Sequence, residues 1–277
     1  MKSLAESSPR RVESRQNARV KELRAGLSRG MKTAQDHIAV EGLHLVQEAV
    51  KSGLRLDTVF LQKGREELLL QLPSINAEIL ILSEDVFSSA AMTEHPQGVA
   101  ALVEAPQFKM QAMFPSAPGP APLVVIAAGL QDPGNLGTLI RSAEAFGATG
   151  MILLPGTVNL WNGKTLRASS GSAFRLPVLP MAVGAAFTTV RDHGVRILAA
   201  VARDGDREAD LRGPTALLIG NEGSGLPEAW IAQADARLTI PFTGAVESLN
   251  AAIAGSVLLY DAMRQRLKAE TMDQGRT

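Results

Sequence analysis

The sequence of 277 residues contains no cysteine, which excludes disulfide bonds, cysteine-ligated zinc and thiol catalysis. This absence fits a reducing compartment, and we expect a cytoplasmic protein. Aromatic residues make up only 4% of the chain, so the core must be built mainly from Ala, Leu, Val and Ile. No apolar run reaches the roughly 18 residues that a membrane span needs, so no membrane association is expected.

Signals for several enzyme classes are also missing. The four histidines (His37, His44, His95 and His193) are scattered without metal-ligand spacing, so no bound metal is expected. There is no glycine-rich loop ending in Gly-Lys-Ser/Thr, and no Gly-x-Ser-x-Gly turn. A nucleotide-dependent α/β hydrolase is therefore a weak interpretation.

Charge is distributed unevenly along a chain whose formal net charge is zero. Residues 1–32 carry nine Lys or Arg against three Glu, whereas the remainder carries 19 basic and 25 acidic residues. Such a basic arm can attract nucleic acid, with Arg15, Arg19 and Lys21 as candidate contacts. A solvated terminus is an equally good explanation of the charge alone, and we expect residues 1–15 to be disordered.

Composition and periodicity divide the rest of the chain into two α/β regions. Residues 16–105 alternate short strands and helices, as expected of a small α/β domain. Residues 106–122 hold five of the prolines and predict a linker. Residues 123–277 open with an apolar run typical of a buried parallel strand and form the second domain.

Four elements expected in the second domain bear on its function. The pattern predicts a strand over 123–128 and a helix over 136–146. It also predicts a strand over 175–178 and a long last helix over 249–268. Ser248 is a good N-cap for that last helix.

Three loops of the second domain share one property. Residues 131–137, 220–226 and 240–250 each place Gly, Pro, Asn or Ser where an apolar run ends. In α/β sheets such positions carry ligand-binding loops, so three of them predict one composite site. Asn135 near a helix start and Arg141 on its flank are the candidate functional side chains of the first loop.

A fourth polar stretch covers residues 164–172. Its cations and hydroxyls, in particular Lys164, Arg167 and Ser169, suit contacts to phosphate. An exposed loop without function explains the same composition equally well.

The three loops, in this order, closely resemble the motifs of the SpoU (TrmH-like) RNA 2′-O-ribose methyltransferases of the SPOUT class. The matching residues are Asp132, Pro133, Asn135, Gly137, Arg141 and Gly147, then Gly220, Asn221, Glu222, Gly223 and Gly225, then Ile240, Pro241, Glu247, Ser248, Leu249 and Asn250. A weaker match upstream, around residues 39–49 and 95–100, is similar to a ribosomal-protein-like RNA-binding domain. It implies that residues 16–105 bind the RNA substrate and that residues 123–277 are the catalytic domain.

The resemblance implies an α/β fold with a parallel sheet, flanking helices and a C-terminal trefoil knot. It implies S-adenosylmethionine as the cofactor and a homodimer formed through the catalytic domain. It carries over Asn135, Arg141, Glu222, Ser248 and Asn250 as active-site residues, and Gly220, Asn221, Gly225, Ile240 and Leu249 as cofactor contacts.

The expected activity is methylation of a ribose 2′-hydroxyl, and the fused first domain favours ribosomal RNA over transfer RNA as the substrate. A non-catalytic RNA-binding or ribosome-assembly protein of the same fold is the alternative. Arginine stays protonated in proteins, so Arg141 is expected to stabilise a forming alkoxide and to grip a phosphate. Glu222 would orient its neighbours or act as the base.

Overall fold

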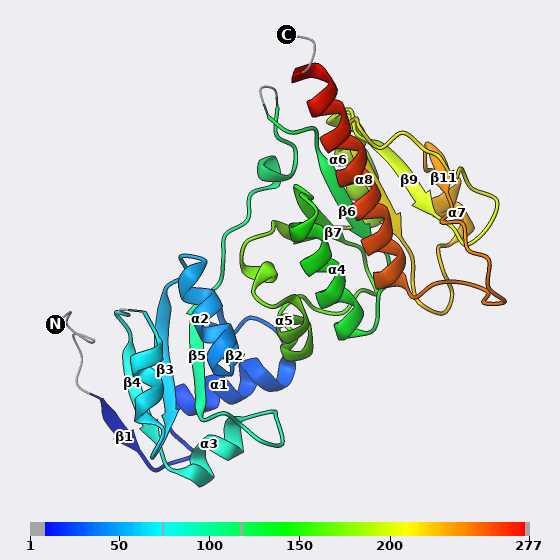
Figure 1. Cartoon of the computed structure of the whole chain (residues 1–277). Helices are drawn as coiled ribbons and strands as arrows, with labels where there is room; N and C mark the ends of the chain where they lie inside the picture. Colours follow the sequence, from blue (N-terminus) through cyan, green and yellow to red (C-terminus); the bar gives the residue numbers. More distant parts are fainter. Residues whose placement is uncertain (1–8, 74, 117–118, 275–277) are drawn as a thin grey trace. The chain divides into compact units, whose positions relative to one another are not determined.

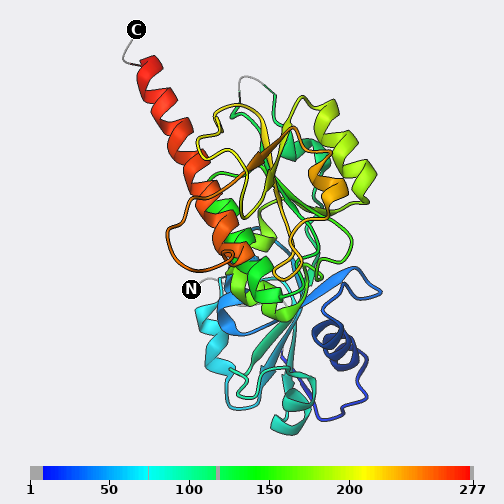
Figure 2. The same ribbon diagram turned by 90° about the vertical axis from the view of Figure 1, so that its right-hand side faces the viewer.

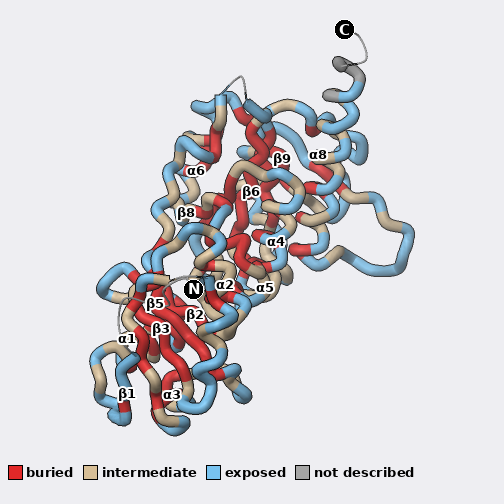
Figure 3. Tube along the Cα trace, turned by 60° about the vertical axis from the view of Figure 1, so that its left-hand side comes forward, coloured by how far each residue is buried: buried red, intermediate tan, exposed pale blue. Residues whose placement is uncertain are grey.

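The computed structural model describes residues 9–73, 75–116 and 119–274, and Figure 1 labels its elements along the chain. The chain divides into two compact units. The first comprises the residues up to Gln107 together with Asn159–Arg175, and the second comprises Phe108–Val158 together with the residues from Leu176 onward. Each unit is built on its own sheet, and Figure 3 shows buried residues concentrated along the strands of both.

The first unit has a mixed sheet whose strands are β1 (Arg10–Val12), β2 (His37–Glu41), β3 (Leu56–Gln62), β4 (Glu78–Leu82) and β5 (Val99–Glu104). Their spatial order is β1-β4-β3-β5-β2. The neighbours β1, β4 and β3 run parallel, whereas β5 is antiparallel to both β3 and β2. The two edges of the sheet therefore belong to the two strands that come first in the chain.

The first unit also contains the helices α1 (Ala18–Arg29), α2 (Leu43–Lys51), α3 (Glu84–Ala90) and α5 (Gly163–Ser169). It has two short 3-10 helices, η1 (Glu66–Gln71) and η3 (Ser172–Phe174). Asn17 caps α1 by accepting a hydrogen bond from the Arg19 amide at 2.9 Å. Val20 and Leu23 of α1 share one apolar cluster with Phe87 of α3 and Phe60 of β3. This cluster fixes α1 and α3 on the sheet, while α2 packs against β2 and β5.

The prediction of disorder over residues 1–15 is wrong for its described part. Arg10–Val12 form strand β1, paired with β4 from Arg10 opposite Leu80 onward. Val12 is buried in the apolar cluster, and Arg10 forms an ion pair with Glu78 at 3.0 Å. Three residues with a single apolar side chain are too short a pattern to recognise as a strand. Residues 1–8 lie outside the described part of the chain.

The second unit has a sheet formed by β6 (Leu123–Ala127), β7 (Gly150–Leu153), β8 (Val178–Pro180), β9 (Arg196–Ala200), β10 (Thr215–Ile219) and β11 (Ala236–Leu238). The order is β11-β9-β10-β6-β7-β8, and every pairing is parallel. The strand predicted over 175–178 is wrong in position, because Arg175 has helical backbone angles and the strand begins only at Val178.

Helices α4 (Pro133–Ala145), α6 (Val183–Asp192), α7 (Glu228–Ile231) and α8 (Ala251–Gln274), with the 3-10 turn η2 (Met110–Met113), cover this sheet. Val124 and Ile126 of β6 share a cluster with Phe187 of α6. Because strand side chains alternate, the intervening β6 residues face the opposite side, where α4 and α8 pack together. Figure 2 shows α6 and α8 on opposite sides of the sheet.

The strand order reverses direction between β10 and β6. The chain runs outward from β6 through β7 to β8, then returns to the other side for β9 and inserts β10 next to β6. The carboxyl ends of β6 and β10 are therefore neighbours, and the amide of Ala128 donates to the carbonyl of Ile219 at 2.8 Å. In parallel sheets a ligand site forms at such a switch point, because the loops from the two strands diverge there.

Candidate active site

The loop after β6 leads into α4 and places Asn135 on its first turn. Asp132 is the N-cap, and its Oδ1 accepts a hydrogen bond from the Asn135 amide at 2.9 Å. Pro133 follows as the first helical residue, a position where the lack of an N–H costs nothing. Arg141 lies farther along α4, is exposed, and makes no hydrogen bond or ion pair with the described residues.

The loop after β10 is closed by its own backbone. Asn221 and Gly225 exchange two amide–carbonyl hydrogen bonds of 3.1 and 3.0 Å. A Cβ on Gly220 would lie 2.6 Å from the carbonyl carbon of Gly225, so this turn has room only for glycine there. The Asn221 Nδ2 donates to the carbonyl of Gly129 at 2.7 Å, which ties this loop to the loop after β6.

The third loop ends at Asn250. Its Oδ1 accepts hydrogen bonds from the amides of Ala252 and Ile253 at 2.9 and 3.2 Å, so Asn250 is the N-cap of α8. The expectation that Ser248 caps this helix is wrong, because the helix starts two residues later than predicted. Ser248 instead lines the neighbouring pocket.

One residue from each loop joins a single chain of hydrogen bonds, which we call the site triad: Asn250, Asn135 and Glu222. The Asn250 Nδ2 donates to Asn135 Oδ1 at 3.0 Å, and the Asn135 Nδ2 donates to Glu222 Oε1 at 2.9 Å. The Gln131 amide and the Asn221 Nδ2 approach the other oxygen, Glu222 Oε2, at 3.4 and 3.3 Å. The structure thus brings the three predicted loops together.

The carboxyl group of Glu222 is surrounded by donors. Burial by itself would raise its pKa, but the hydrogen bonds from Asn135 and from the backbone amides of Glu222, Gln131 and Asp132 outweigh burial and lower it. Glu222 is therefore ionised at neutral pH, and hydrogen bonds from amide groups stabilise its charge. A carboxylate held in this way is a weak proton acceptor, so the geometry favours an orienting role over that of a base.

A pocket of about 360 Å³ lies beside the site triad, in the size range of small-ligand sites. It is lined by both predicted cofactor loops, including Gly220, Asn221, Gly225, Ile240 and Leu249. Glu222 also lines it and connects it to Asn135. Apolar walls from Leu238, Ile240 and Leu258, together with a loop kept open by glycine, fit a nucleoside with a flexible polar tail such as S-adenosylmethionine.

Some pocket residues carry no motif that marks them in the sequence. Ala200, Val201 and Ala202 line the pocket at the carboxyl end of β9, and Phe242 lines it from the third loop. Their common signal is position, because the carboxyl ends of parallel strands converge on one edge of the sheet. Among the described residues, no group of three or more His, Asp or Glu is placed to hold a metal ion, and no helix among them is long and apolar enough to cross a membrane.

The predicted RNA contacts in the first unit divide into two kinds. Arg15, Lys21, Lys164 and Arg167 are exposed. Ser169 is fully buried, and its hydroxyl donates to the carbonyl of Leu166, one turn back in α5. The structure therefore gives no support to a contact between this hydroxyl and RNA. The exposed loop that was the alternative interpretation of residues 164–172 is wrong in form, because most of the stretch belongs to α5.

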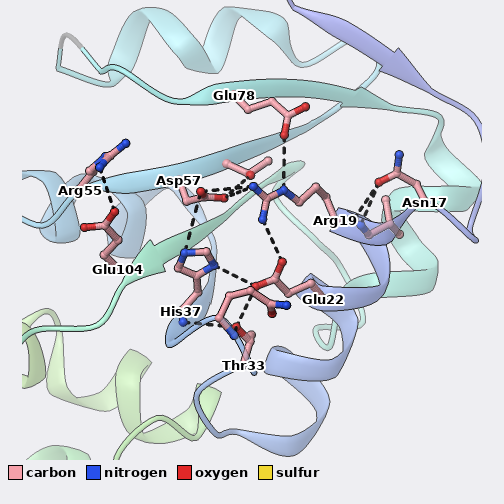
Figure 4. Close-up of polar contacts among 12 residues, drawn as sticks. Asn17, Arg19, Glu22, Thr33, His37, Arg55, Asp57, Glu78 and Glu104 are labelled. Carbon is pink, nitrogen blue, oxygen red and sulfur yellow. Dashed lines mark hydrogen bonds and ion pairs between the residues drawn. The ribbon is translucent and has the colours of Figure 1, made fainter.

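Arg19 is held in an ion network drawn in Figure 4. Its guanidinium lies 3.1 Å from a carboxylate oxygen of Glu22 and 3.0 Å from one of Asp57. Glu22 also accepts hydrogen bonds from Thr33 Oγ1 and contacts the His37 ring at 2.8 and 2.9 Å. With its donors directed to carboxylates of its own unit, Arg19 has a structural role here that charge counting did not reveal.

Comparison with known proteins places this site in a family. Residues 122–260 match the model of the SpoU rRNA Methylase family, and residues 17–101 match the MRM3-like substrate binding domain. The chain therefore belongs to the SpoU rRNA methylase family. The predicted SPOUT fold class and the predicted class of activity, ribose 2′-O-methylation of RNA with S-adenosylmethionine, are confirmed.

Three relatives illustrate the match. A Bacillus subtilis protein named 23S rRNA (guanosine(2553)-2′-O)-methyltransferase RlmP is 34% identical over 91% of this chain and 98% of its own. A Streptomyces viridochromogenes protein named 23S rRNA (uridine(2479)-2′-O)-methyltransferase is 33% identical over 95% of this chain and 94% of its own. The crystal structure of the SpoU methyltransferase AviRb from that organism, in complex with AdoMet, matches this structure with a TM-score of 0.77 at 32% sequence identity. The match covers 91% of this chain and 99% of the AviRb chain.

Proposed function

We propose that the protein methylates a ribose 2′-hydroxyl of ribosomal RNA, with the site triad and Arg141 acting on the nucleotide and the pocket holding S-adenosylmethionine. The observation that carries the proposal is the hydrogen-bonded chain from Asn250 through Asn135 to Glu222, which joins the three loops beside that pocket. The names of the two relatives support ribosomal RNA as the substrate. They name guanosine and uridine, so the base itself is left open.

The bound cofactor would supply a methyl group already activated on a sulfonium sulfur. The remaining task is to bring the weakly nucleophilic 2′-hydroxyl into line with that methyl group, for which positioning can supply roughly 7–11 kcal/mol in favourable cases. Asn135, held between Glu222 and Asn250, has one fixed orientation and suits the placement of the ribose.

Arg141 supplies the positive charge. Its guanidinium stays protonated, so it stabilises the alkoxide that forms as the hydroxyl proton is lost to water, and it grips an adjacent phosphate. Because no described carboxylate pairs with Arg141, its charge is available to the substrate. Glu222 keeps Asn135 in place, and its lowered pKa makes it a poor recipient of the proton.

The first unit binds the RNA, through Arg15, Lys21, Lys164 and Arg167. Homodimer formation is supported by the exposed apolar side chains of α8. Ile253, Val257 and Tyr260 follow one another at helical spacing and are 51%, 41% and 50% exposed. A ribosomal RNA substrate and the lack of cysteine support a cytoplasmic location. Light scattering of the purified protein tests the dimer, and a monomeric mass at micromolar concentration would contradict it.

The substrate is tested by mapping 2′-O-methylated nucleotides in total RNA from a strain that lacks the gene. We expect one modified position to disappear from ribosomal RNA, and a loss confined to transfer RNA would contradict the assignment. Calorimetry with S-adenosylmethionine tests the non-catalytic alternative, since a pure RNA-binding protein of this fold would bind none.

A further inference from the structure

The end of α1 and the start of α5 are packed closely in the first unit. Gly30 ends α1 in the left-handed conformation, with φ of +59°. A Cβ on Gly30 would lie 2.8 Å from the Cα of Asn162, so this contact requires glycine. Asn162 in turn caps α5 by accepting a hydrogen bond from the Lys164 amide at 2.9 Å. Two residues 132 positions apart in sequence are thereby fixed side by side.

Both segments at this contact are free of carboxylates. No Asp or Glu occurs between Glu22 and Asp36, and none occurs between Glu144 and Asp192. Lys32 is paired with Asp36 at 2.9 Å. Arg29 and Arg167 are both exposed, and neither makes a hydrogen bond or an ion pair with any residue that the structure describes.

Arg167 is directed back along its own helix. Its Nη1 lies 3.3 Å from the position that a Cβ on Gly163 would take. The guanidinium therefore lies beside the first turn of α5, and the residue is still exposed to solvent. Arg29 directly precedes Gly30 on the other side of the contact, so the two unpaired arginines belong to the two segments that the Gly30–Asn162 packing holds together.

We propose that Arg29 and Arg167 form a phosphate-binding surface for the backbone of the RNA substrate. The inference rests on the proposed function for the choice of RNA as the polyanion. A guanidinium presents a fork of donors that matches two phosphate oxygens, and two such forks that no described carboxylate occupies suit phosphates of one RNA strand. Contacts of this kind set the position of the RNA and carry no base specificity.

The test compares two double variants of the full-length protein by RNA titration over a range of salt concentrations. Arg29→Ala/Arg167→Ala removes the surface. Arg55→Ala/Arg212→Ala removes the same charge from exposed arginines that are paired with Glu104 and Asp210. The probe is a fluorescein-labelled 30-nucleotide RNA of mixed sequence, followed by anisotropy.

We expect the first double variant to bind the probe roughly tenfold to fortyfold more weakly at 0.1 M salt. The slope of log affinity against log salt should fall by about 0.7–0.9 for each lost contact. In the control, Arg55→Ala/Arg212→Ala, the RNA affinity and its dependence on salt should both change far less. Equal losses of RNA affinity in the two double variants would show an effect of net charge alone and would overturn the proposed phosphate-binding surface. Unchanged RNA affinity in Arg29→Ala/Arg167→Ala would also overturn it.

Two further measurements keep the surface and the proposed function separate. In the wild-type protein, RNA should protect Arg29 and Arg167 from modification by phenylglyoxal, and full reactivity of both in the complex would contradict the surface without any variant. Calorimetric binding of S-adenosylmethionine and methyl transfer by the wild type test the proposed function. If the wild type failed to bind S-adenosylmethionine or to transfer the methyl group, the proposed function would be overturned. The RNA titration would still decide whether Arg29 and Arg167 bind phosphate.

Discussion

Two partly buried glutamates, one in each unit, have lowered pKa values for different reasons. Burial opposes ionisation in both. Glu22 is stabilised by Thr33, His37 and Arg19, and Arg19 is itself shared with Asp57. Glu222 is stabilised by amide groups alone, and no described cation pairs with it.

The difference separates a structural cluster from the proposed functional one. In the first unit, the positive and negative charges pair with one another, so we call this cluster closed. In the second unit, the carboxylate orients amides, while Arg141, on the same helix as Asn135, is exposed and unpaired within the described part of the chain. An unpaired cation on that helix is available to a substrate.

The largest effect is expected from Arg141→Ala, which removes the unpaired cation of the proposed site. Methyl transfer at saturating RNA should fall by about 10²–10³-fold, as for the loss of one oxyanion-stabilising donor. Binding of S-adenosylmethionine should be unchanged, because Arg141 does not line the pocket in the described structure. Single-turnover methylation and calorimetry measure the two quantities, and Arg212→Ala, which removes an arginine paired with Asp210, is the matched control. Transfer at the wild-type rate would refute the role.

Glu222→Gln sharpens the comparison by replacing the carboxylate with an amide of the same shape. One side of the new side chain would present an N–H₂ to groups that are already donors, Asn135 Nδ2 or the Gln131 amide. We expect a loss of roughly tenfold to 10²-fold in kcat, because Asn135 loses its single orientation, with a loss of about 1–2 kcal/mol in the free energy of unfolding. A variant with full activity would show that the orientation of Asn135 is immaterial.

Glu22→Gln is the matched substitution in the closed cluster. It leaves Arg19 and His37 short of an acceptor, and we expect a loss of about 2–3 kcal/mol in the free energy of unfolding, measured by urea denaturation. Glu22 lies outside the site, so the kcat of the folded variant should match the wild type. A pattern in which Glu22→Gln impaired kcat and left stability intact would reverse the comparison.

The smallest effect is the pH dependence of that stability difference. The folded-state pKa of Glu22 is lowered, so its contribution is fully present above the unfolded-state pKa of about 4.3 and is lost as pH falls through the folded-state pKa. The gap in unfolding free energy between wild type and Glu22→Gln should therefore narrow as the pH falls below about 4, through the folded-state pKa of Glu22. A gap that widens over that acid range would contradict the assigned cause.

The three loops of the site could be predicted because turn residues at the ends of apolar runs are local signals. The strand order that makes β6 and β10 neighbours is not local, and the knotted class followed from the family resemblance alone. Residues 159–175 show the limit best. Ser169 looks like an exposed hydroxyl in the sequence, but a hydrogen bond to Leu166 within its own helix satisfies it and allows its burial.

The role of Arg19 was beyond prediction for a related reason. In sequence it is one cation among nine in residues 1–32, whereas its partner Asp57 comes from β3, thirty-eight positions along the chain. The predicted N-cap of α8, Ser248, is two residues too early, because Ser and Asn are equally good capping types. Only the described contacts to Ala252 and Ile253 decide between them.

The most direct test of the account is mass spectrometry of nucleosides from ribosomal RNA incubated with the purified protein and S-adenosylmethionine that carries a trideuterated methyl group. The account predicts a single 2′-O-methylated nucleoside that contains the labelled methyl group, formed by the wild type and absent with Arg141→Ala. Label found on a base, or an equal yield of labelled ribose with Arg141→Ala, would contradict it.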